Sequence, residues 1–219
     1  MKFKVITLFP QFITSLRNYS IIGRAYRNKL IKIETIDLRG FGLGKYKQVD
    51  DRPFGGSVGM LLRVDVVAEA IKSAIKPKSA KRRIILLSPQ GKQFNQKMAE
   101  RLSAYNELVL VCGHYEGFDS RIRDLVDEEI SIGPYILTGG EIPAMVLIDA
   151  ISRYKKRVLG KFASKDNETF SVVDKKKIIE YPQYTRPREY RGKAVPDVLL
   201  SGDHAQIKKW QDEHTRRDA

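Results

Sequence analysis

The sequence contains very little cysteine and histidine. Its single cysteine, Cys112, excludes an internal disulfide and a metal site built from several cysteines. Cys112 follows four apolar residues, which favours a buried, inert thiol over a nucleophile. The three histidines, His114, His204 and His214, lie far apart along the chain and do not form the short-spaced pair that zinc enzymes use.

The sequence also lacks a long hydrophobic segment. No stretch approaches the length of a membrane-spanning helix. The apolar run near the N-terminus is interrupted by Pro10 and is too short for the core of a secretion signal. We therefore expect a cytoplasmic protein without a membrane partner.

The common phosphate-binding and hydrolase motifs are absent from the sequence. There is no glycine-rich loop that ends in Gly-Lys-Ser/Thr, no Gly-x-Gly-x-x-Gly after a strand and no Gly-x-Ser-x-Gly. Nucleotide hydrolysis and the usual dinucleotide binding are therefore disfavoured.

What the chain does have is an excess of positive charge. Its 219 residues include 40 Lys and Arg against 26 Asp and Glu, a formal net charge of +14. Residues 161–219 hold 13 basic and 10 acidic residues, so most of the excess belongs to residues 1–160. This surplus favours nucleic acid as a partner, because each neutralised phosphate releases counterions. A general solubility charge is the plainer alternative.

Three short apolar runs each lead into a turn that contains glycine. The runs are Ile84–Leu87, Leu108–Val111 and Ile130–Ile132. Continuous apolar runs are typical of strands buried on both faces, which occur in parallel sheets under helices. Ligands bind at the carboxyl ends of such strands, where glycine lets the backbone approach them closely. The three turns therefore predict a small-molecule pocket built largely from main chain.

The rest of residues 1–160 continues the alternation of strand and helix. Two more strands are predicted at Phe3–Leu8 and Ile31–Leu38, with a helix opened by Pro10 between them. Apolar residues at helical spacing predict further helices at Val64–Ile75, Phe94–Leu102, Phe118–Leu125 and Glu141–Tyr154. This order indicates an α/β fold with a mostly parallel sheet. The irregular segment Arg39–Gly59 carries six glycines, which suggests backbone that fits around something, although a flexible excursion is nearly as plausible.

The pattern changes after residue 160. Polar and charged residues interrupt any apolar period over residues 161–177, which indicates a flexible linker. A final amphipathic helix is predicted to begin near Ser201 or Asp203, either of which is a plausible N-cap. We predict a core domain of residues 1–160, a linker of residues 161–177 and a small, mainly helical C-terminal domain of residues 178–219.

Six motifs, kept in order along nearly the whole chain, carry a resemblance to one family. They are Asp50-Asp51-Arg52-Pro53, Ser88-Pro89-Gln90-Gly91, Cys112-Gly113-x-Tyr115-Glu116-Gly117, Ser131-Ile132-Gly133-x-Tyr135-x-Leu137-x-Gly139-Gly140-Glu141, Pro182-x-Tyr184-Thr185-Arg186-Pro187 and Leu199-Leu200-Ser201-Gly202-x-His204-Ala205. Each motif alone is weak evidence. Together they resemble the bacterial tRNA (guanine-N1)-methyltransferases, the TrmD family of the SPOUT methyltransferase superfamily.

The resemblance implies a fold and a reaction. The fold would be SPOUT-type, with a deep trefoil knot, and the protein would be an obligate homodimer whose C-terminal domain binds tRNA. The reaction would move a methyl group from S-adenosylmethionine to N1 of the guanosine at position 37 of tRNA, beside the anticodon. Two alternatives remain open: a related SPOUT enzyme that methylates a ribose 2′-hydroxyl, and a non-catalytic RNA-binding protein that has lost its donor.

The resemblance also assigns catalytic roles. By position, the base that removes the N1 proton of guanine would be Glu168, where the family more commonly has aspartate, with Asp166 as the competing candidate. Arg153 matches the catalytic arginine, which would offset the charge that develops on O6. Glu116 matches a pocket glutamate that would meet the positive charge of the donor or hold Mg²⁺. His114 stands where the family usually has arginine, so a permanent cation that could contact RNA or substrate is missing.

The loops that bind S-adenosylmethionine in the family match thirteen positions of this chain: Ser88, Pro89, Gly113, Tyr115, Glu116, Ile132, Gly133, Pro134, Tyr135, Ile136, Leu137, Gly139 and Gly140. Their backbone would read the adenine edge and hold the methionine part in a bent shape. Without the resemblance these glycines would be interpreted as ordinary tight turns. Three such turns at neighbouring strand ends still favour a pocket.

Overall fold

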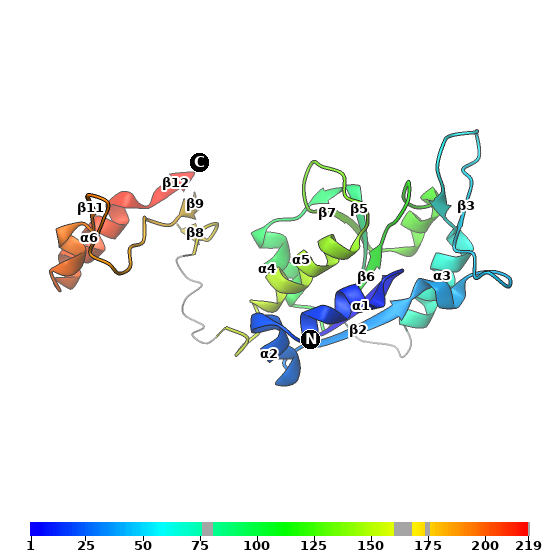
Figure 1. The fold of residues 1–219 in the computed structure, drawn as a ribbon, viewed down its shortest axis with the longest axis horizontal. Coiled ribbons are helices and arrows are strands. Elements are labelled where there is room, and N and C mark those ends of the chain that lie inside the picture. The colour runs from blue at the N-terminus through cyan, green and yellow to red at the C-terminus, as the bar shows by residue number, and fades with distance from the viewer. Residues whose placement is uncertain (76–80, 160–167, 174–175, 219) are drawn as a thin grey trace. The chain divides into compact units, whose positions relative to one another are not determined.

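The chain folds into two compact units, residues Met1–Gly160 (unit 1) and Lys161–Ala219 (unit 2). The structure, a computed structural model, describes residues 1–75, 81–159, 168–173 and 176–218 (Figure 1). The predicted linker therefore lies partly outside the described residues, and so does Asp166. No helix of the described ranges has both the length and the apolar character needed to cross a bilayer.

A five-stranded sheet forms the centre of unit 1. All neighbouring strands are parallel, in the order β2-β1-β6-β5-β7. The strands are β1 (Lys2–Thr7), β2 (Lys32–Asp37), β5 (Arg82–Gln93), β6 (Glu107–Cys112) and β7 (Glu128–Ser131). Every residue of the central strand β6 is buried, as expected for a strand covered on both faces. The predicted α/β class and mostly parallel sheet are confirmed.

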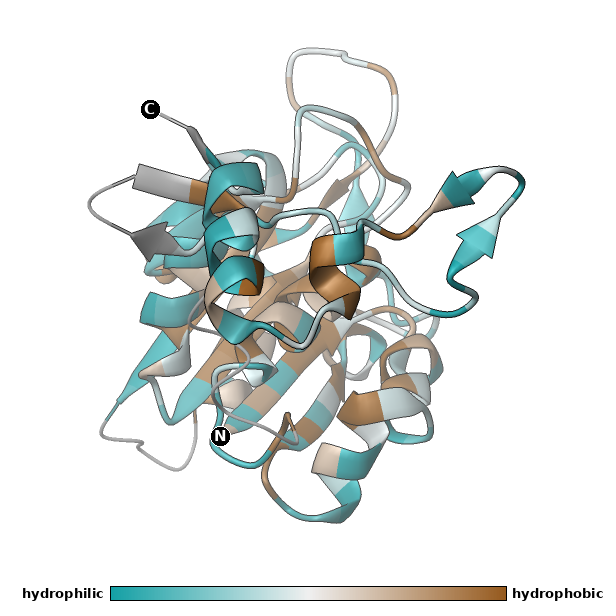
Figure 2. Cartoon of the chain, turned by 90° about the vertical axis from the view of Figure 1, so that its left-hand side faces the viewer, coloured by the Kyte–Doolittle hydropathy of each residue, from teal (hydrophilic) through white to brown (hydrophobic). Residues whose placement is uncertain are grey.

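Helices cover both faces of this sheet, and alternate residues of each strand pack on opposite layers. On β6, Leu108 and Leu110 join one apolar core and Val109 and Val111 join the other. Figure 2 shows apolar residues gathered along the strands and the adjoining helix sides. The first core lies under α1 (Pro10–Thr14), α2 (Ser20–Arg27), α4 (Gln96–Ser103) and α5 (Glu141–Ser152). The second lies under α3 (Val64–Ala74) and the 3₁₀ helices η2 (Leu38–Phe41) and η3 (Ser120–Leu125).

Three local predictions differ from the structure. The helix opened by Pro10 ends at Thr14, continues as a short 3₁₀ turn, η1 (Ser15–Arg17), and gives way to a separate helix, α2. The segment expected as a helix at Phe118–Leu125 contains a 3₁₀ helix, η3, instead. The turn expected after Leu87 lies within β5: Ile130 of β7 pairs with both Leu87 and Lys92, so the four residues between them form a bulge.

Helix α5 is apolar on nearly all sides, and only part of its surface is covered within unit 1. Ala144, Leu147 and Ile151 are fully buried in the first core, whereas Ile142 is 46% exposed and Val146 is 39% exposed. Two apolar side chains of α5 are therefore left at the surface of unit 1.

The glycine-rich segment before α3 forms a long excursion with fixed ends. The short strands β3 (Asp50–Asp51) and β4 (Leu61–Leu62) pair with each other. Between them, the side chains of Phe54 and Val58 are almost fully exposed. At the far end the backbone N–H of Leu62 donates to the carbonyl of Gly117, and that of Glu116 donates to Met60. The excursion is therefore joined to the loop that follows β6.

Unit 2 contains more strand than the sequence predicted. Its described residues form a small sheet, a hairpin, a 3₁₀ helix and one α-helix: β8 (Val172–Val173), β9 (Lys176–Ile179), β12 (Arg216–Asp218), β10 (Glu189–Tyr190), β11 (Lys193–Ala194), η5 (Asp197–Leu200) and α6 (His204–His214). Asp203 caps α6 by accepting hydrogen bonds from the N–H groups of Ala205 and Gln206, which confirms one of the two predicted caps. Trp210 contacts Tyr181 and Tyr184 and stacks on His214.

Candidate functional site

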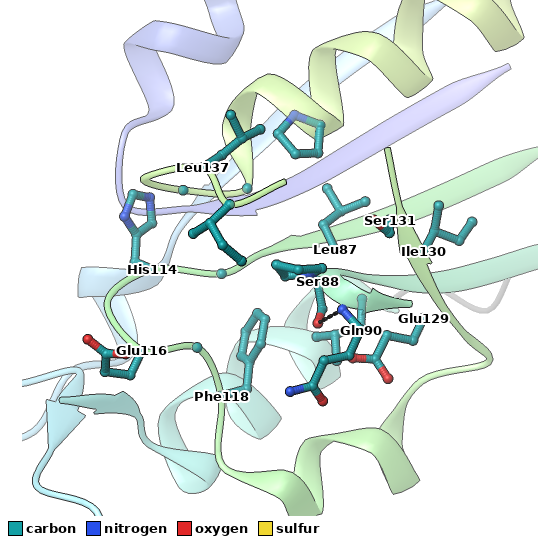
Figure 3. A pocket seen from close by; sticks show the side chains of 18 of the residues that line it. Leu87, Ser88, Gln90, His114, Glu116, Phe118, Glu129, Ile130, Ser131 and Leu137 are labelled. Carbon is teal, nitrogen blue, oxygen red and sulfur yellow. Dashed lines mark hydrogen bonds between the residues drawn. The ribbon is translucent and has the colours of Figure 1, made fainter. Parts of the chain in front are cut away.

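The carboxyl ends of β5, β6 and β7 surround a cavity of about 500 Å³ (Figure 3). One wall is the bulge Ser88–Gln90 in β5, another is the loop Gly113–Asp119 after β6, and a third is the loop Ile132–Gly140 after β7. The three glycine-bearing segments that the sequence marked as a pocket thus lie around one cavity. This is the edge of a parallel sheet where small-molecule sites usually occur.

Twelve of the thirteen predicted donor-binding residues line this cavity, and the remaining one does not. The lining residues are Ser88, Pro89, Gly113, Tyr115, Glu116, Ile132, Gly133, Tyr135, Ile136, Leu137, Gly139 and Gly140. Pro134 belongs to the same loop, but it is exposed and outside the lining.

Main-chain contacts join the two loops that follow β6 and β7. The N–H of Gly140 donates to the carbonyl of Gly113 at 2.8 Å, and His114 and Gly139 form a single antiparallel bridge. A Cβ on Gly140 would lie 2.6 Å from the Cα of Cys112, so only glycine permits this approach. Glycine here serves close backbone packing beneath the cavity rather than flexibility.

The loop after β6 makes a tight turn at the mouth of the cavity. Tyr115 has a φ of +58°, in the left-handed region that residues with a side chain seldom adopt. The turn is held by the N–H of Gly117, which donates to His114, and by the N–H of Glu116, which donates to Met60. Such a backbone conformation persists only where its surroundings enforce it, and it is common at binding sites.

A buried carboxylate lies next to this loop. Glu141, the first residue of α5, is only 3% exposed. It accepts hydrogen bonds from the hydroxyl of Thr7 at 2.5 Å and from Nε2 of His114 at 2.7 Å. Burial by itself raises the pKa of the Glu141 carboxyl, but the bonds from His114 and Thr7 outweigh burial and lower the net pKa. Glu141 is therefore ionised at neutral pH, at the helix end where negative charge is favoured.

Cys112, the last residue of β6, is buried as the sequence predicted. Burial, and next to it the negative charge of Glu141, raise the pKa of the thiol well above its ordinary value. The thiol is therefore protonated and unreactive at neutral pH, which agrees with the expectation of an inert cysteine.

A polar cluster that the motifs did not predict also lines the cavity. Arg123 donates to Glu129 through Nε at 2.9 Å and to Gln90 through Nη2 at 2.5 Å, and all three residues line the cavity. Gln90 stands inside a quoted motif, yet it carried no assigned role. Phe118 lines the cavity as well and lies so close to Gly113 that a Cβ there would meet its ring at 2.8 Å. In the sequence, the one signal for Phe118 as a lining residue is its position directly after the glycine-bearing turn.

The residues predicted to be catalytic are outside the lining of this cavity. Arg153 is the C-cap residue of α5, in unit 1. Glu168 is in unit 2, and Asp166 is outside the described residues. Glu116 lines the cavity, but the described ranges contain no cluster of three or more His, Cys, Asp or Glu side chains arranged for a metal ion.

Comparison with known proteins decides the family. The family model for tRNA (Guanine-1)-methyltransferase TrmD matches residues 1–219. The chain belongs to this family. Similar members are the tRNA (guanine-N(1)-)-methyltransferases of Ruminiclostridium cellulolyticum, 48% identical over 96% of this chain and 89% of the relative, and of Alkaliphilus oremlandii, 48% identical over 96% and 86%. The protein of that description from Mycoplasmopsis agalactiae is 47% identical over 97% of this chain and 91% of its own length.

Membership of the TrmD family confirms the resemblance carried by the six motifs. A member of a methyltransferase family must bind a methyl donor, and the cavity in unit 1 provides a concave site of suitable size. TrmD-family membership also agrees with the basic surplus of the chain, because tRNA is an anionic polymer.

Proposed function

We propose that the chain transfers a methyl group from S-adenosylmethionine to N1 of the guanosine at position 37 of tRNA, next to the anticodon. The family supplies the reaction class and the tRNA guanine substrate. The observation that carries the finer proposal is the cavity at the carboxyl ends of β5, β6 and β7, which is lined by residues of three glycine-bearing segments.

The donor would occupy this cavity, which falls within the range typical of small-molecule sites. Backbone groups of Ile132–Leu137 would recognise the adenine edge, and Ser88 and Pro89 would form the opposite wall. The carboxylate of Glu116 would face the sulfonium. Because the sulfonium already activates the methyl group, the protein needs no covalent nucleophile and mainly has to align donor and acceptor.

The acceptor has to lose a proton, because N1 of guanine is protonated and poorly nucleophilic at neutral pH. Glu168 would take this proton while the lone pair of N1 forms the new bond to the methyl carbon. The electrons of the broken C–S bond remain on sulfur, which leaves S-adenosylhomocysteine. The guanidinium of Arg153 would offset the negative charge that develops on O6. Asp166 is the competing base.

A magnesium ion would bind beside Glu116, if the reaction of this chain uses one. Mg²⁺ usually keeps several waters and takes only one or two carboxylates from a protein, often with oxygens of the substrate. One carboxylate at the cavity, with oxygens from donor and RNA, would fit that pattern.

Unit 2 would bind tRNA through residues 178–219, connected to the core by the linker of residues 161–177. This segment exposes arginines together with Tyr184 and Tyr190, and the guanidinium of Arg191 lies 5.2 Å from the ring centre of Tyr190. Basic and aromatic side chains together provide phosphate contacts and stacking surfaces for RNA. The exposed basic residues of the hairpin region are Arg186, Arg188, Arg191 and Lys193.

The trefoil knot and the homodimer belong to the same proposal. β7 is at the edge of the sheet, yet α5, which follows it, packs against β1 and β6, so the chain must return past β5. This return, with Gly140 pressed against Cys112, supports a knotted crossing. The exposed apolar side chains of α5, Ile142 and Val146, support a subunit interface at that helix.

A methylation assay tests the proposed function directly. Purified protein, labelled S-adenosylmethionine and Mg²⁺ should label tRNA with guanosine at position 37 and leave tRNA with adenosine there unlabelled. Nuclease mapping should place the methyl group on the base. A methyl group on a ribose would instead identify a 2′-O-methyltransferase, and no incorporation into any tRNA would refute the proposal.

A further inference from the structure

His114 has a partner inside the protein, although the sequence suggested only a lost contact with RNA or substrate. Its imidazole Nε2 lies 2.7 Å from Oε2 of Glu141, and both side chains are nearly buried, at 13% and 4% exposure. His114 belongs to the loop after β6, whereas Glu141 begins α5 directly after the loop that follows β7. The pair therefore joins the two neighbouring loops that follow β6 and β7 and that both line the cavity.

The chemistry of the pair fixes which group donates. The lowered pKa of Glu141 makes it a carboxylate, which can only accept, so Nε2 of His114 carries the hydrogen. The other carboxylate oxygen accepts from Thr7 at the end of β1. Glu141 is thus anchored to the sheet by Thr7 and to α5 by its own backbone, and it presents one fixed acceptor to the loop of His114.

The imidazole is also enclosed by packing. The ring of Phe9 lies 5.1 Å away between ring centres. His114 also lies so close to Gly139 that a Cβ there would be 2.3 Å from Cε1 of the ring. Figure 3 shows the imidazole beside the loop that carries Leu137. The ring is therefore a spacer of fixed size and orientation between the two loops.

We propose that His114 is a positioning residue that sets the spacing of the two donor-binding loops. It acts through Glu141 and Gly139, without contact with the reacting atoms, and the inference rests on the proposed donor site. Loss of the ring would remove the side-chain bond between the loop Gly113–Gly117 and α5 and leave the carboxylate of Glu141 with one partner fewer. A donor gripped by backbone groups of both loops would then bind weakly, because such contacts depend on loop spacing.

Arginine at position 114 provides a rescue variant. A guanidinium also donates to a carboxylate. If the bridge to Glu141 is what matters, His114→Arg should bind the donor almost as well as the wild type, whereas His114→Ala should not. A residue whose role is contact with RNA would change tRNA affinity instead.

Calorimetric titration with S-adenosylhomocysteine tests the proposal on full-length variants. We expect His114→Ala to weaken binding about tenfold or more, the usual scale for losing a charged hydrogen bond in a buried site, and His114→Arg to stay within about threefold of wild type. Arg101→Ala is the matched control, because it removes a partner of the half-buried Glu128 at the other end of β7. Its affinity should match the wild type. In methylation kinetics the KM for S-adenosylmethionine should rise in His114→Ala while the KM for tRNA stays constant.

Several results would overturn the proposal. Wild-type affinity in His114→Ala would do so, as would an equal loss in Arg101→Ala, which would indicate general destabilisation. A raised KM for tRNA with a normal KM for the donor would make His114 an RNA contact. If His114→Ala does not fold, His114→Leu fills a similar volume without an N–H donor, and wild-type binding there would reject the role of the bond to Glu141. A wild type that binds no S-adenosylhomocysteine would refute the donor site, and the inference with it.

Discussion

The backbone N–H of Gly140 donates a hydrogen bond to the carbonyl oxygen of Gly113 at 2.8 Å, which ties the start of α5 to the end of β6. This bond, together with the bridge between His114 and Gly139, holds the two loops of the cavity at a fixed separation. Main-chain bonds therefore hold the two loops together alongside the side-chain bond between His114 and Glu141.

A methyl group at residue 140 should disrupt both the fold and the site. In Gly140→Ala the new Cβ meets the backbone of Cys112 at 2.6 Å, which must shift to make room. We expect a loss of about 1 to 3 kcal/mol in the free energy of unfolding, typical of overpacking, and at least about tenfold weaker binding of S-adenosylhomocysteine. Urea unfolding and calorimetry measure the two effects. Gly40→Ala is the control, because a Cβ at Gly40 has no neighbour within 4 Å.

Replacing the proposed base should stop the chemistry and spare the donor. Glu168→Gln keeps the size of the side chain and removes its ability to accept a proton, so single-turnover methylation should fall by at least about a hundredfold. Donor affinity should not change, because Glu168 is not among the residues that line the cavity. An active Glu168→Gln beside an inactive Asp166→Asn would transfer the role of base to Asp166.

The ionisation of Glu141 should make stability depend on pH in a defined direction. Its folded-state pKa is below the ordinary value of 4.5. Its contribution is therefore complete above about pH 4.5 and is lost as the pH falls through the folded pKa. Glu141→Gln should cost about 1 to 3 kcal/mol at pH 7, and the difference from wild type should shrink below pH 4.5. Urea unfolding at several pH values tests this, and the exposed Glu69→Gln serves as control. A difference that stays constant down to pH 3 would contradict it.

Unit 2 should carry tRNA affinity without donor affinity. On α6, the ring of Trp210 contacts the rings of Tyr181, Tyr184 and His214. Trp210→Ala removes the largest side chain of this cluster, and tRNA binding should weaken at least about tenfold while S-adenosylhomocysteine binding is unchanged. Filter binding and calorimetry separate the two. Glu213→Ala, an exposed change in the same helix, should bind tRNA like the wild type. Unaltered tRNA binding by Trp210→Ala would exclude this unit from tRNA recognition.

The sequence predicts β6 and the first half of β5 well, because these segments are largely buried and consist mainly of continuous apolar runs. It does not predict the break between α1 and α2. The apolar spacing of Phe12, Leu16 and Tyr19 runs on as if one helix continued, but Tyr19 is extended and 71% exposed. The corner is closed by Gly23, whose missing Cβ lets α2 touch the backbone of Asn18. A contact of this kind does not change the spacing of apolar residues, so the sequence pattern does not predict it.

The glycine loops of the candidate site were predictable from motifs, whereas its side-chain contacts were not. Arg123 and Gln90 meet because η3 and the bulge in β5 bring them together, and apolar periodicity specifies neither feature. The bridge between His114 and Glu141 likewise joins residues 27 positions apart. In unit 2 the strands are two to four residues long, too short for an alternating pattern to indicate them.

Cys112 lies directly beneath the contact between Gly140 and Gly113, and it is the only thiol in the chain. The thiol is buried and protonated. It can therefore react with an alkylating reagent only when the backbone contacts around it open. The rate at which Cys112 is alkylated therefore reports how often the cavity opens. We expect a bound donor to lower that rate.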